Sequence, residues 1–372
     1  MTPEEPPAHP TPVPLPPPVD FSATKYPLDR AHLFDPFWKS ETVYGESVAL
    51  LKEEDSEPPS GTLLFAPRQI LQVRSSDGNT LYTEGRDYLI DKVRRRLLLA
   101  PGSRIPFIRR ADLYKRKGEP RSIPHKADDP ETNLLYQEGW FRSIQVEVDY
   151  LREEPWTGYT PAFAGTHIPR TIARIESGAP LNICVTGDSI ATGANASDDT
   201  PPYMPGFVPL TGFALRQRCR GKISLTNLAR GGTQATDGLD KVPETVAANP
   251  DLVIIAFGMN DVSRRQPITY SNNIGAIIDG IRRALPEAEL ILLSSILANP
   301  EWNWSPADQF LPHRDALMTL FCPGIAFADM TQLWADIMRE KRYLDLTGNG
   351  INHPNDFGQR LYAQALLALL VR

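Results

Sequence analysis

The 372-residue chain contains only three cysteines, and they are far apart in the sequence, at Cys184, Cys219 and Cys322. Three scattered cysteines cannot build a disulfide framework, and none belongs to a C-x-x-C pair that suits zinc. The six histidines never approach metal-ligand spacing with one another. We therefore expect a fold held together by packing, with no metal and no other cofactor.

The chain also lacks an excess of positive charge and a long apolar run. Its 39 Lys and Arg residues against 45 Asp and Glu residues give a formal net charge of −6, so nucleic acid is not an expected partner. Nowhere do about 18 apolar residues follow one another, so we expect no membrane-spanning helix. The N-terminus has no charged-then-apolar secretory signal. We expect a protein that stays where it is made, or an exported one whose signal has been removed.

Proline is the over-represented residue, at 36 of 372, about twice average usage. Nine of these prolines lie in residues 1–19, which predicts an extended, disordered tail. The remaining chain has the composition of a soluble globular protein, with 41% hydrophobic and 23% charged residues. Its length predicts two domains.

Residues 20–161 contain short β-type runs separated by turn signals, and long helical patterns are missing. This pattern favours a β-sandwich of jelly-roll type, followed by a linker at 162–179. Residues 118–138 show no pattern that assigns them. The expected strands are 61–68, 70–75, 80–83, 88–90, 96–100 and 144–151.

From residue 180 to 372 brief apolar runs alternate with segments of helical periodicity, five times over. This alternation predicts a three-layer α/β/α domain with a parallel sheet, whose ligands bind beyond the carboxyl ends of the strands. The expected strands are 181–186, 222–226, 252–257, 290–294 and 325–328, and the expected helices are 208–219, 236–249, 271–285, 306–321 and 357–370.

Three of these strands end in residues that suit acyl chemistry. The first leads into Ser189, whose hydroxyl at a strand tip can be an exposed nucleophile. The second leads into Gly231 and Gly232, which form either a structural turn or a backbone N–H donor for an oxyanion. The third leads into Asn260, whose amide can stabilise an oxyanion or can serve as a helix cap or turn former.

A fourth candidate, His353, precedes the last helix. Imidazole titrates near neutrality, so it can accept a serine proton and return it to a leaving alcohol. A lone loop histidine is usually a polar surface group, but here four weak signals fall in order on the one sheet edge that builds sites. The rival histidines, His167 and His313, do not stand at predicted strand ends.

In combination, these ordered blocks resemble those of the SGNH (GDSL) hydrolase superfamily over residues 180–372. The resemblance implies that Ser189 is the nucleophile and His353 the general base. It also implies that the backbone N–H groups of Ser189 and Gly232 and the amide of Asn260 form the oxyanion hole. The blocks are Gly187-Asp188-Ser189, Asn227 to Gly232, Gly258-x-Asn260-Asp261 and His353-Pro354.

The sequence departs from the family at the residue that orients the histidine. The family has an aspartate three residues before it, and Gly350 stands there. Three explanations remain open: a Ser–His dyad steered by a backbone carbonyl, which we favour, an amide substituting for the acid, or an acid from elsewhere in the chain. We interpret Asp356 as the cap of the last helix. The candidate amides are Asn349 and Asn352, and the candidate acids are Asp329 and Asp345.

A β-domain followed by an SGNH domain resembles two-domain carbohydrate acetyl-esterases such as carbohydrate esterase family 2. We accordingly expect a serine esterase that removes short acyl groups from carbohydrates. Trp302 and Trp304, in the loop after the fourth strand, either stack on sugar rings or cover the sheet edge, and Tyr203 is another wall candidate. The alternatives are an acyltransferase with the same Ser and His, and a carbohydrate-binding protein that has lost catalysis.

Overall fold

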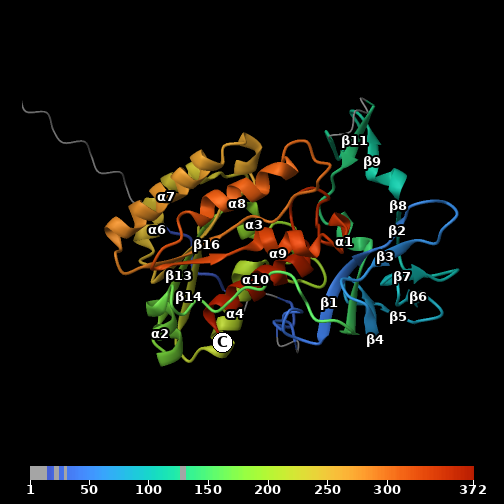
Figure 1. The fold of residues 1–372 in the computed structure, drawn as a ribbon, viewed down its shortest axis with the longest axis horizontal. Coiled ribbons are helices and arrows are strands. Elements are labelled where there is room, and N and C mark those ends of the chain that lie inside the picture. The colour runs from blue at the N-terminus through green and yellow to red at the C-terminus, as the bar shows by residue number, and fades with distance from the viewer. Residues whose placement is uncertain (1–14, 21–24, 29–31, 126–130) are drawn as a thin grey trace, which may run out of the picture.

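A computed structural model describes residues 15–20, 25–28, 32–125 and 131–372. Two parts lie side by side, a layered α/β part and a β-rich part formed by residues 42–152 (Figure 1). Most of the predicted tail lies outside the described residues. At its end, however, the Val19 N–H donates to the carbonyl of Leu225 at 2.8 Å, so residue 19 belongs to the fold and not to a free tail.

The α/β part is built on one five-stranded parallel sheet with the order β14-β13-β15-β16-β17. Neighbouring residues of each strand point to opposite faces: Ile254 packs into one hydrophobic cluster, and Val253 and Ile255 pack into another. This confirms the three-layer α/β/α prediction. The strands are β13 (Leu181–Gly187), β14 (Ile223–Asn227), β15 (Leu252–Ala256), β16 (Glu289–Leu293) and β17 (Ile325–Ala328).

Helices cover both faces of this sheet, with α7 and α8 on one side and α4 and α10 on the other (Figure 1). The helix predicted over 236–249 is instead two short helices, because Pro243 starts a new helix there. The helix predicted from residue 306 begins at Phe310. The helices on the two faces include α4 (Phe207–Arg218), α5 (Ala235–Asp240), α6 (Val242–Ala247), α7 (Pro267–Ala284), α8 (Phe310–Met318), α9 (Met330–Ile337) and α10 (Asp356–Leu370).

The predicted linker at 162–179 forms regular structure. It contains α2 (Pro169–Ser177), whose first N–H groups, those of Arg170 and Thr171, donate to the buried carboxylate of Glu289 at 3.0 and 2.7 Å. A carboxylate at a helix N-terminus satisfies N–H groups that have no partner within the helix. The segment is therefore part of the α/β packing.

The β-rich part consists of three sheets with mostly antiparallel pairing, which confirms its predicted class. Its jelly-roll form and the domain boundaries at 161 and 180 stay predictions. The unassigned stretch 118–138 contributes β10 and β11, which pair with each other. The sheets are β1 (Thr42–Ala49), β12 (Gln145–Arg152), β4 (Pro67–Ser75), β5 (Leu81–Tyr82); β6 (Tyr88–Asp91), β7 (Arg96–Leu99), β3 (Ser60–Thr62), β2 (Leu51–Lys52), β8 (Ile108–Arg109); and β10 (Ser122–Ile123), β11 (Thr132–Leu135), β9 (Tyr114–Arg116).

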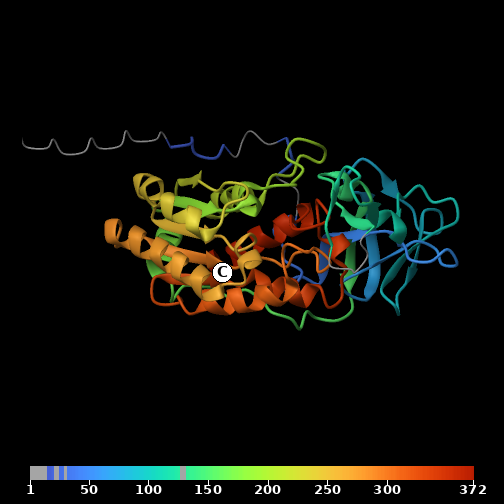
Figure 2. The ribbon, with the colours of Figure 1, turned by 90° about the horizontal axis from the view of Figure 1, so that it is seen from above.

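The two parts meet where β1 and β12 contact the chain between α9 and α10, and Figure 2 shows the β-rich part at one end of the layered part. Asn355 donates from its amide to Ser47 Oγ and to Gln145 Oε1, both at 2.9 Å, and it is buried. These contacts run from the β-rich part to the residues that precede α10. Within the described ranges, no helix combines the length and the apolar character that crossing a bilayer requires.

Candidate active site

Ser189 lies at the carboxyl end of β13, as the first residue of the short helix α3 (Ser189–Thr192). The turn into α3 is tight: a Cβ on Gly187 would lie 2.6 Å from the carbonyl oxygen of Ala256, so only glycine fits there. Asp188 caps α3 by accepting the N–H of Ile190 at 3.0 Å. Burial raises the pKa of Asp188 to about 7. The serine is thus held on a rigid strand-to-helix turn.

The structure brings Ser189 and His353 together, although 164 residues separate them. The Nε2 atom of His353 lies 2.8 Å from Ser189 Oγ. On the other side of the ring, Nδ1 lies 2.5 Å from the side-chain oxygen of Asn195. A hydroxyl on one nitrogen of an imidazole and an orienting oxygen on the other is the arrangement that activates a nucleophile.

The electrostatics of the site keep the imidazole neutral. Burial lowers the pKa of His353 to about 4, because removal from water disfavours the charged ring, and the nearby carboxylate of Glu138 opposes this effect. At neutral pH the ring therefore carries one proton. Its other nitrogen is free to accept the proton of Ser189.

Gly232 and Asn260 lie in loops at the same sheet edge. The loop of Gly232 is fixed to the end of β13, since Arg230 N and Thr233 Oγ1 both donate to the carbonyl of Gly187, at 3.0 and 3.1 Å. Gly232 has φ +77° and open space where a Cβ would be. Asn260 donates from its amide to the carbonyl of Thr233 at 2.9 Å and caps no helix with its side chain. Its amide is therefore turned toward the glycine loop.

Of the three explanations offered for the missing aspartate, an amide near the ring fits in kind, but the amide is that of Asn195 and neither Asn349 nor Asn352. The oxygen of Asn349 accepts the N–H groups of Ile351, Asn352 and His353 at 3.0 to 3.2 Å, so it organises the histidine loop from within. Asn352 accepts from the Asn349 amide at 3.0 Å. The proposed acids, Asp329 and Asp345, bind Arg314 and the N–H of Ala49 instead. The atom at Nδ1 belongs to Asn195, a side-chain oxygen and not a backbone carbonyl.

The β-rich part occupies the place of the expected aspartate. Gly350 has φ +91°, and a Cβ there would lie 2.5 Å from the Phe141 ring and 2.9 Å from the carbonyl oxygen of Leu135. The N–H of Gly139 also donates to the carbonyl of Gly348 at 3.2 Å. A side chain at residue 350 is thus excluded on steric grounds, which explains why the sequence departs from the family at this position.

Sequence reasoning missed Asn195, and it assigned Asp356 wrongly. Asn355 caps α10 by accepting the N–H of Gly358. Asp356 instead accepts the N–H and the hydroxyl of Ser197 at 2.9 and 2.7 Å. It therefore fixes the loop that carries Asn195. The available signal was the Gly-Ala-Asn run at residues 193–195, four to six residues after the serine, but nothing in its spacing distinguishes it from an ordinary turn.

The tryptophan loop is bound to the histidine loop. Asn299 donates from its backbone N–H to Ile351 O at 2.7 Å and from its amide to Gly350 O at 2.8 Å. Trp302 is partly buried against the core, and Trp304 is 59% exposed. The covering role offered for these indoles thus fits Trp302 better than Trp304.

Tyr203 and the two rival histidines have the following neighbours. The ring of Tyr203 lies under the Lys25 ammonium. His313 is in α8, with its Nδ1 2.7 Å from Gln309 O, and His167 packs on Phe321 with 4.6 Å between ring centroids.

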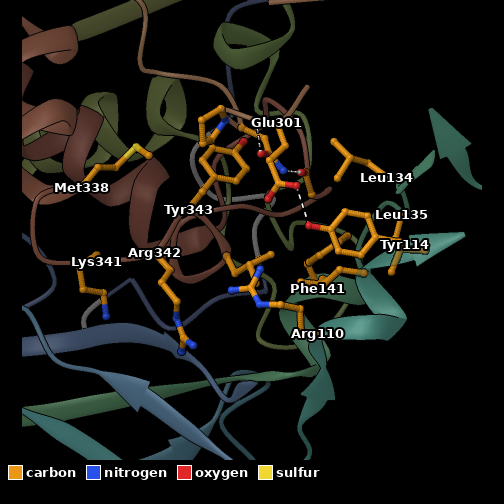
Figure 3. Close-up of a pocket in the computed structure, with 15 residues that line it drawn as sticks. Arg110, Tyr114, Leu134, Leu135, Phe141, Glu301, Met338, Lys341, Arg342 and Tyr343 are labelled. Atoms are coloured by element: carbon orange, nitrogen blue, oxygen red, sulfur yellow. Dashed lines mark hydrogen bonds between the residues drawn. The ribbon is translucent and has the colours of Figure 1, made fainter. Parts of the chain in front are cut away.

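A cavity of about 290 Å³ lies between the two parts (Figure 3). Tyr114 donates to the carboxylate of Glu301 at 2.6 Å on one side of it, and Arg110 lies beside them. Gly350 lines this cavity, whereas Ser189 and His353 do not. Across the described ranges, no three His, Cys, Asp or Glu side chains are grouped so that they could hold a metal ion.

Comparison with known proteins identifies the class of the α/β part. Residues 185–361 match the GDSL-like Lipase/Acylhydrolase family, so this region, just under half of the chain, is a GDSL-like lipase/acylhydrolase domain. This confirms the family that the motifs resemble. A search of curated proteins gives no match.

Similar solved structures include three esterases or lipases. A two-domain esterase active on acetylated mannans has a TM-score of 0.45 and 19% identity over 56% of this chain, and the match spans only 54% of that esterase. A lipase from a goat rumen metagenome has a TM-score of 0.42 and 19% identity, covering 50% of this chain and 96% of its own. An acetylxylan esterase from Geobacillus stearothermophilus has a TM-score of 0.43 and 17% identity, covering 52% of this chain and 96% of its own.

Proposed function

We propose that this protein is a serine esterase that removes short acyl groups, chiefly acetyl, from carbohydrate esters through an acyl-Ser189 intermediate. The observation that carries the proposal is the 2.8 Å contact between His353 Nε2 and Ser189 Oγ at the carboxyl edge of the sheet. A neutral imidazole on a serine hydroxyl, on a GDSL-like domain, is the arrangement that acyl transfer needs.

The reaction runs in two halves. His353 Nε2 takes the proton of Ser189 as Oγ attacks the ester carbonyl, and the tetrahedral intermediate collapses when the imidazolium returns that proton to the leaving sugar oxygen. Water then loses a proton to the same Nε2 and attacks the acyl-serine. The second collapse restores the serine hydroxyl and releases the carboxylic acid.

In this mechanism the negative oxygen that forms at each attack is stabilised by three donors. These are the N–H groups of Ser189 and Gly232 and the amide of Asn260, which carries a second hydrogen beyond the one given to Thr233. The glycine loop lies next to the serine, since a Cβ on Gly231 would be 3.9 Å from the Ser189 Cβ, an ordinary contact distance.

Asn260→Ala is expected to lower kcat about 10²- to 10³-fold with little change in KM, because the amide acts on charge that exists only in the transition state. Initial rates measured over a range of nitrophenyl acetate concentrations give both kcat and KM. Asn182→Ala is the matched control: it removes an amide that donates to backbone carbonyls near the other end of β13, and kcat should stay within twofold. A rise in KM at unchanged kcat for Asn260→Ala would assign that residue to ground-state binding instead.

The substrate class rests on the exposed indole of Trp304, on a loop bound to the histidine loop. Indole faces suit stacking on the apolar face of a pyranose ring. Rates on nitrophenyl esters from acetate to decanoate, together with acetylated xylan and mannan oligosaccharides, test the proposal. We expect acetate to be fastest and acetylated sugars to be deacetylated. A preference for decanoate would contradict the short-acyl assignment.

A further inference from the structure

We propose that Asn195 is the residue that positions the catalytic base, so that a neutral amide replaces the family's aspartate. The inference rests on the proposed function, because the proposed function is what makes His353 the general base. It adds the residue that sets the orientation and tautomer of the imidazole, which sequence reasoning did not find.

The tautomer follows from the two contacts of His353. For the hydroxyl of Ser189 to be activated, Nε2 must accept, so the ring proton must be on Nδ1. The atom facing Nδ1 must then be an acceptor, and Asn195 Oδ1 lies there at 2.5 Å. An amide oxygen therefore does for ring orientation what a carboxylate oxygen does in an acid-containing triad.

The position of Asn195 is itself built by its surroundings. Asn195 adopts φ +64°, a left-handed conformation that asparagine tolerates better than most residues. Two residues on, Ser197 is held by both oxygens of the buried Asp356 carboxylate. On the opposite side Gly348 packs so closely that a Cβ there would lie 2.8 Å from the Asn195 Cβ. Asp356 and the histidine loop thus hold the amide from two sides.

An amide orients the ring without supplying charge, and this has a consequence for pH. The charged group that acts on the His353 ring is the Glu138 carboxylate from the β-rich part. In the neighbouring loop, Asp356 of α10 binds Ser197, and Arg142 of α1 (Trp140–Ser143) donates to Thr200. None of them bonds to Nδ1. Because burial lowers the pKa of His353 to about 4, the base is neutral above that pH. We therefore expect kcat/KM to rise through about pH 4 and then stay flat toward neutrality.

The test uses Asn195→Ala and the near-isosteric Asn195→Asp, with Asn272→Asp on the exposed surface of α7 as the control for an added charge. Asn195→Ala should lower kcat about 10- to 100-fold with KM little changed. Asn195→Asp places a carboxylate on Nδ1, so the acid limb of the kcat/KM profile should move up by one pH unit or more. Asn272→Asp should leave rate and profile as in the wild type.

A second readout does not depend on turnover. NMR with ¹⁵N-labelled histidine reports both the tautomer of His353 and its titration. We expect the Nδ1–H tautomer in the wild type and a raised imidazole pKa in Asn195→Asp. Wild-type kcat in Asn195→Ala, or an unchanged His353 titration in Asn195→Asp, would overturn the inference. If these NMR results appear while no ester is hydrolysed by the wild type, the proposed function fails and the role of Asn195 in holding the ring stands.

Discussion

Ser189→Ala is expected to reduce kcat on acetyl esters by about 10⁶-fold while the protein stays folded, because no other atom takes the place of the attacking oxygen. The change removes only the hydroxyl of a buried residue at the start of α3, and this hydroxyl lies 2.8 Å from His353 Nε2. Substrate affinity should change little, since Oγ contributes to bond formation and not to holding the sugar. The rate is measured with enzyme in excess over substrate, so that a slow residual reaction is visible.

Two controls make this result specific. Ser177→Ala, which removes an exposed hydroxyl at the end of α2, should keep wild-type kcat. A serine-directed phosphonate should form one adduct on the wild type and none on Ser189→Ala. A folded wild type that takes up no phosphonate and hydrolyses no ester would favour a carbohydrate-binding protein, and acyl transfer to an added sugar acceptor in preference to water would favour an acyltransferase.

The sheet of the α/β part could be predicted from sequence because each strand is a short apolar run with turn-forming or polar residues on both sides. The run 252–257 is an example: every residue of β15 is buried, and the strand pairs with β13 and β16. Errors arose at helix ends and breaks, such as Pro243, where one long periodic segment becomes two helices. Hydrophobic periodicity indicates which face of a helix is buried, but it does not define the residue at which the helix ends.

The site could be predicted where chemistry coincides with strand ends, and not where it depends on contacts between distant loops. Ser189 and His353 have side chains that suit acyl chemistry, and both were expected at the carboxyl edge of the predicted sheet. The contact between Asn195 and His353 spans 158 residues, and it depends on Asp356 holding Ser197, which no local pattern encodes. The exclusion of a side chain at Gly350 comes from Phe141, in the other part of the molecule.

The β-rich part was predicted as a separate accessory domain, but its contacts with the histidine loop are extensive. Besides Phe141, the N–H of Gln137 donates to the carbonyl of Asn349, and the Gln145 amide donates to the carbonyls of Leu344 and Thr347. Most of these contacts use backbone atoms, which leave little trace in the sequence. The geometry of the histidine loop is therefore set jointly by both parts.

Lys341 connects the two parts through a buried ion pair. Its side chain is fully buried, and Nζ donates to Glu46 Oε1 at 2.6 Å, to Ser47 O at 2.9 Å and to Thr62 O at 2.6 Å. Glu46 is also fully buried and accepts in addition from the N–H of Leu64 and the hydroxyl of Tyr150. Removing one partner of such a pair leaves the other charge buried and uncompensated.

Lys341→Met is accordingly expected to lower the free energy of unfolding by about 3–5 kcal/mol. The double variant Glu46→Gln/Lys341→Met should recover part of that loss, because the charge of Glu46 is then removed as well, whereas the buried Asp345 carboxylate, 3.8 Å from Nζ in the wild type, remains. Urea denaturation followed by tryptophan fluorescence and circular dichroism measures both. Lys92→Met, on the exposed surface of the β-rich part, should change stability by less than about 0.5 kcal/mol. Equal destabilisation in the single and double variants would show that the lysine acts through packing of its stem and not through its charge. Because Lys341 lies outside the Ser189–His353 contact, the fraction of Lys341→Met that stays folded should retain the wild-type kcat, which separates the effect of this ion pair from that of Ser189 and His353.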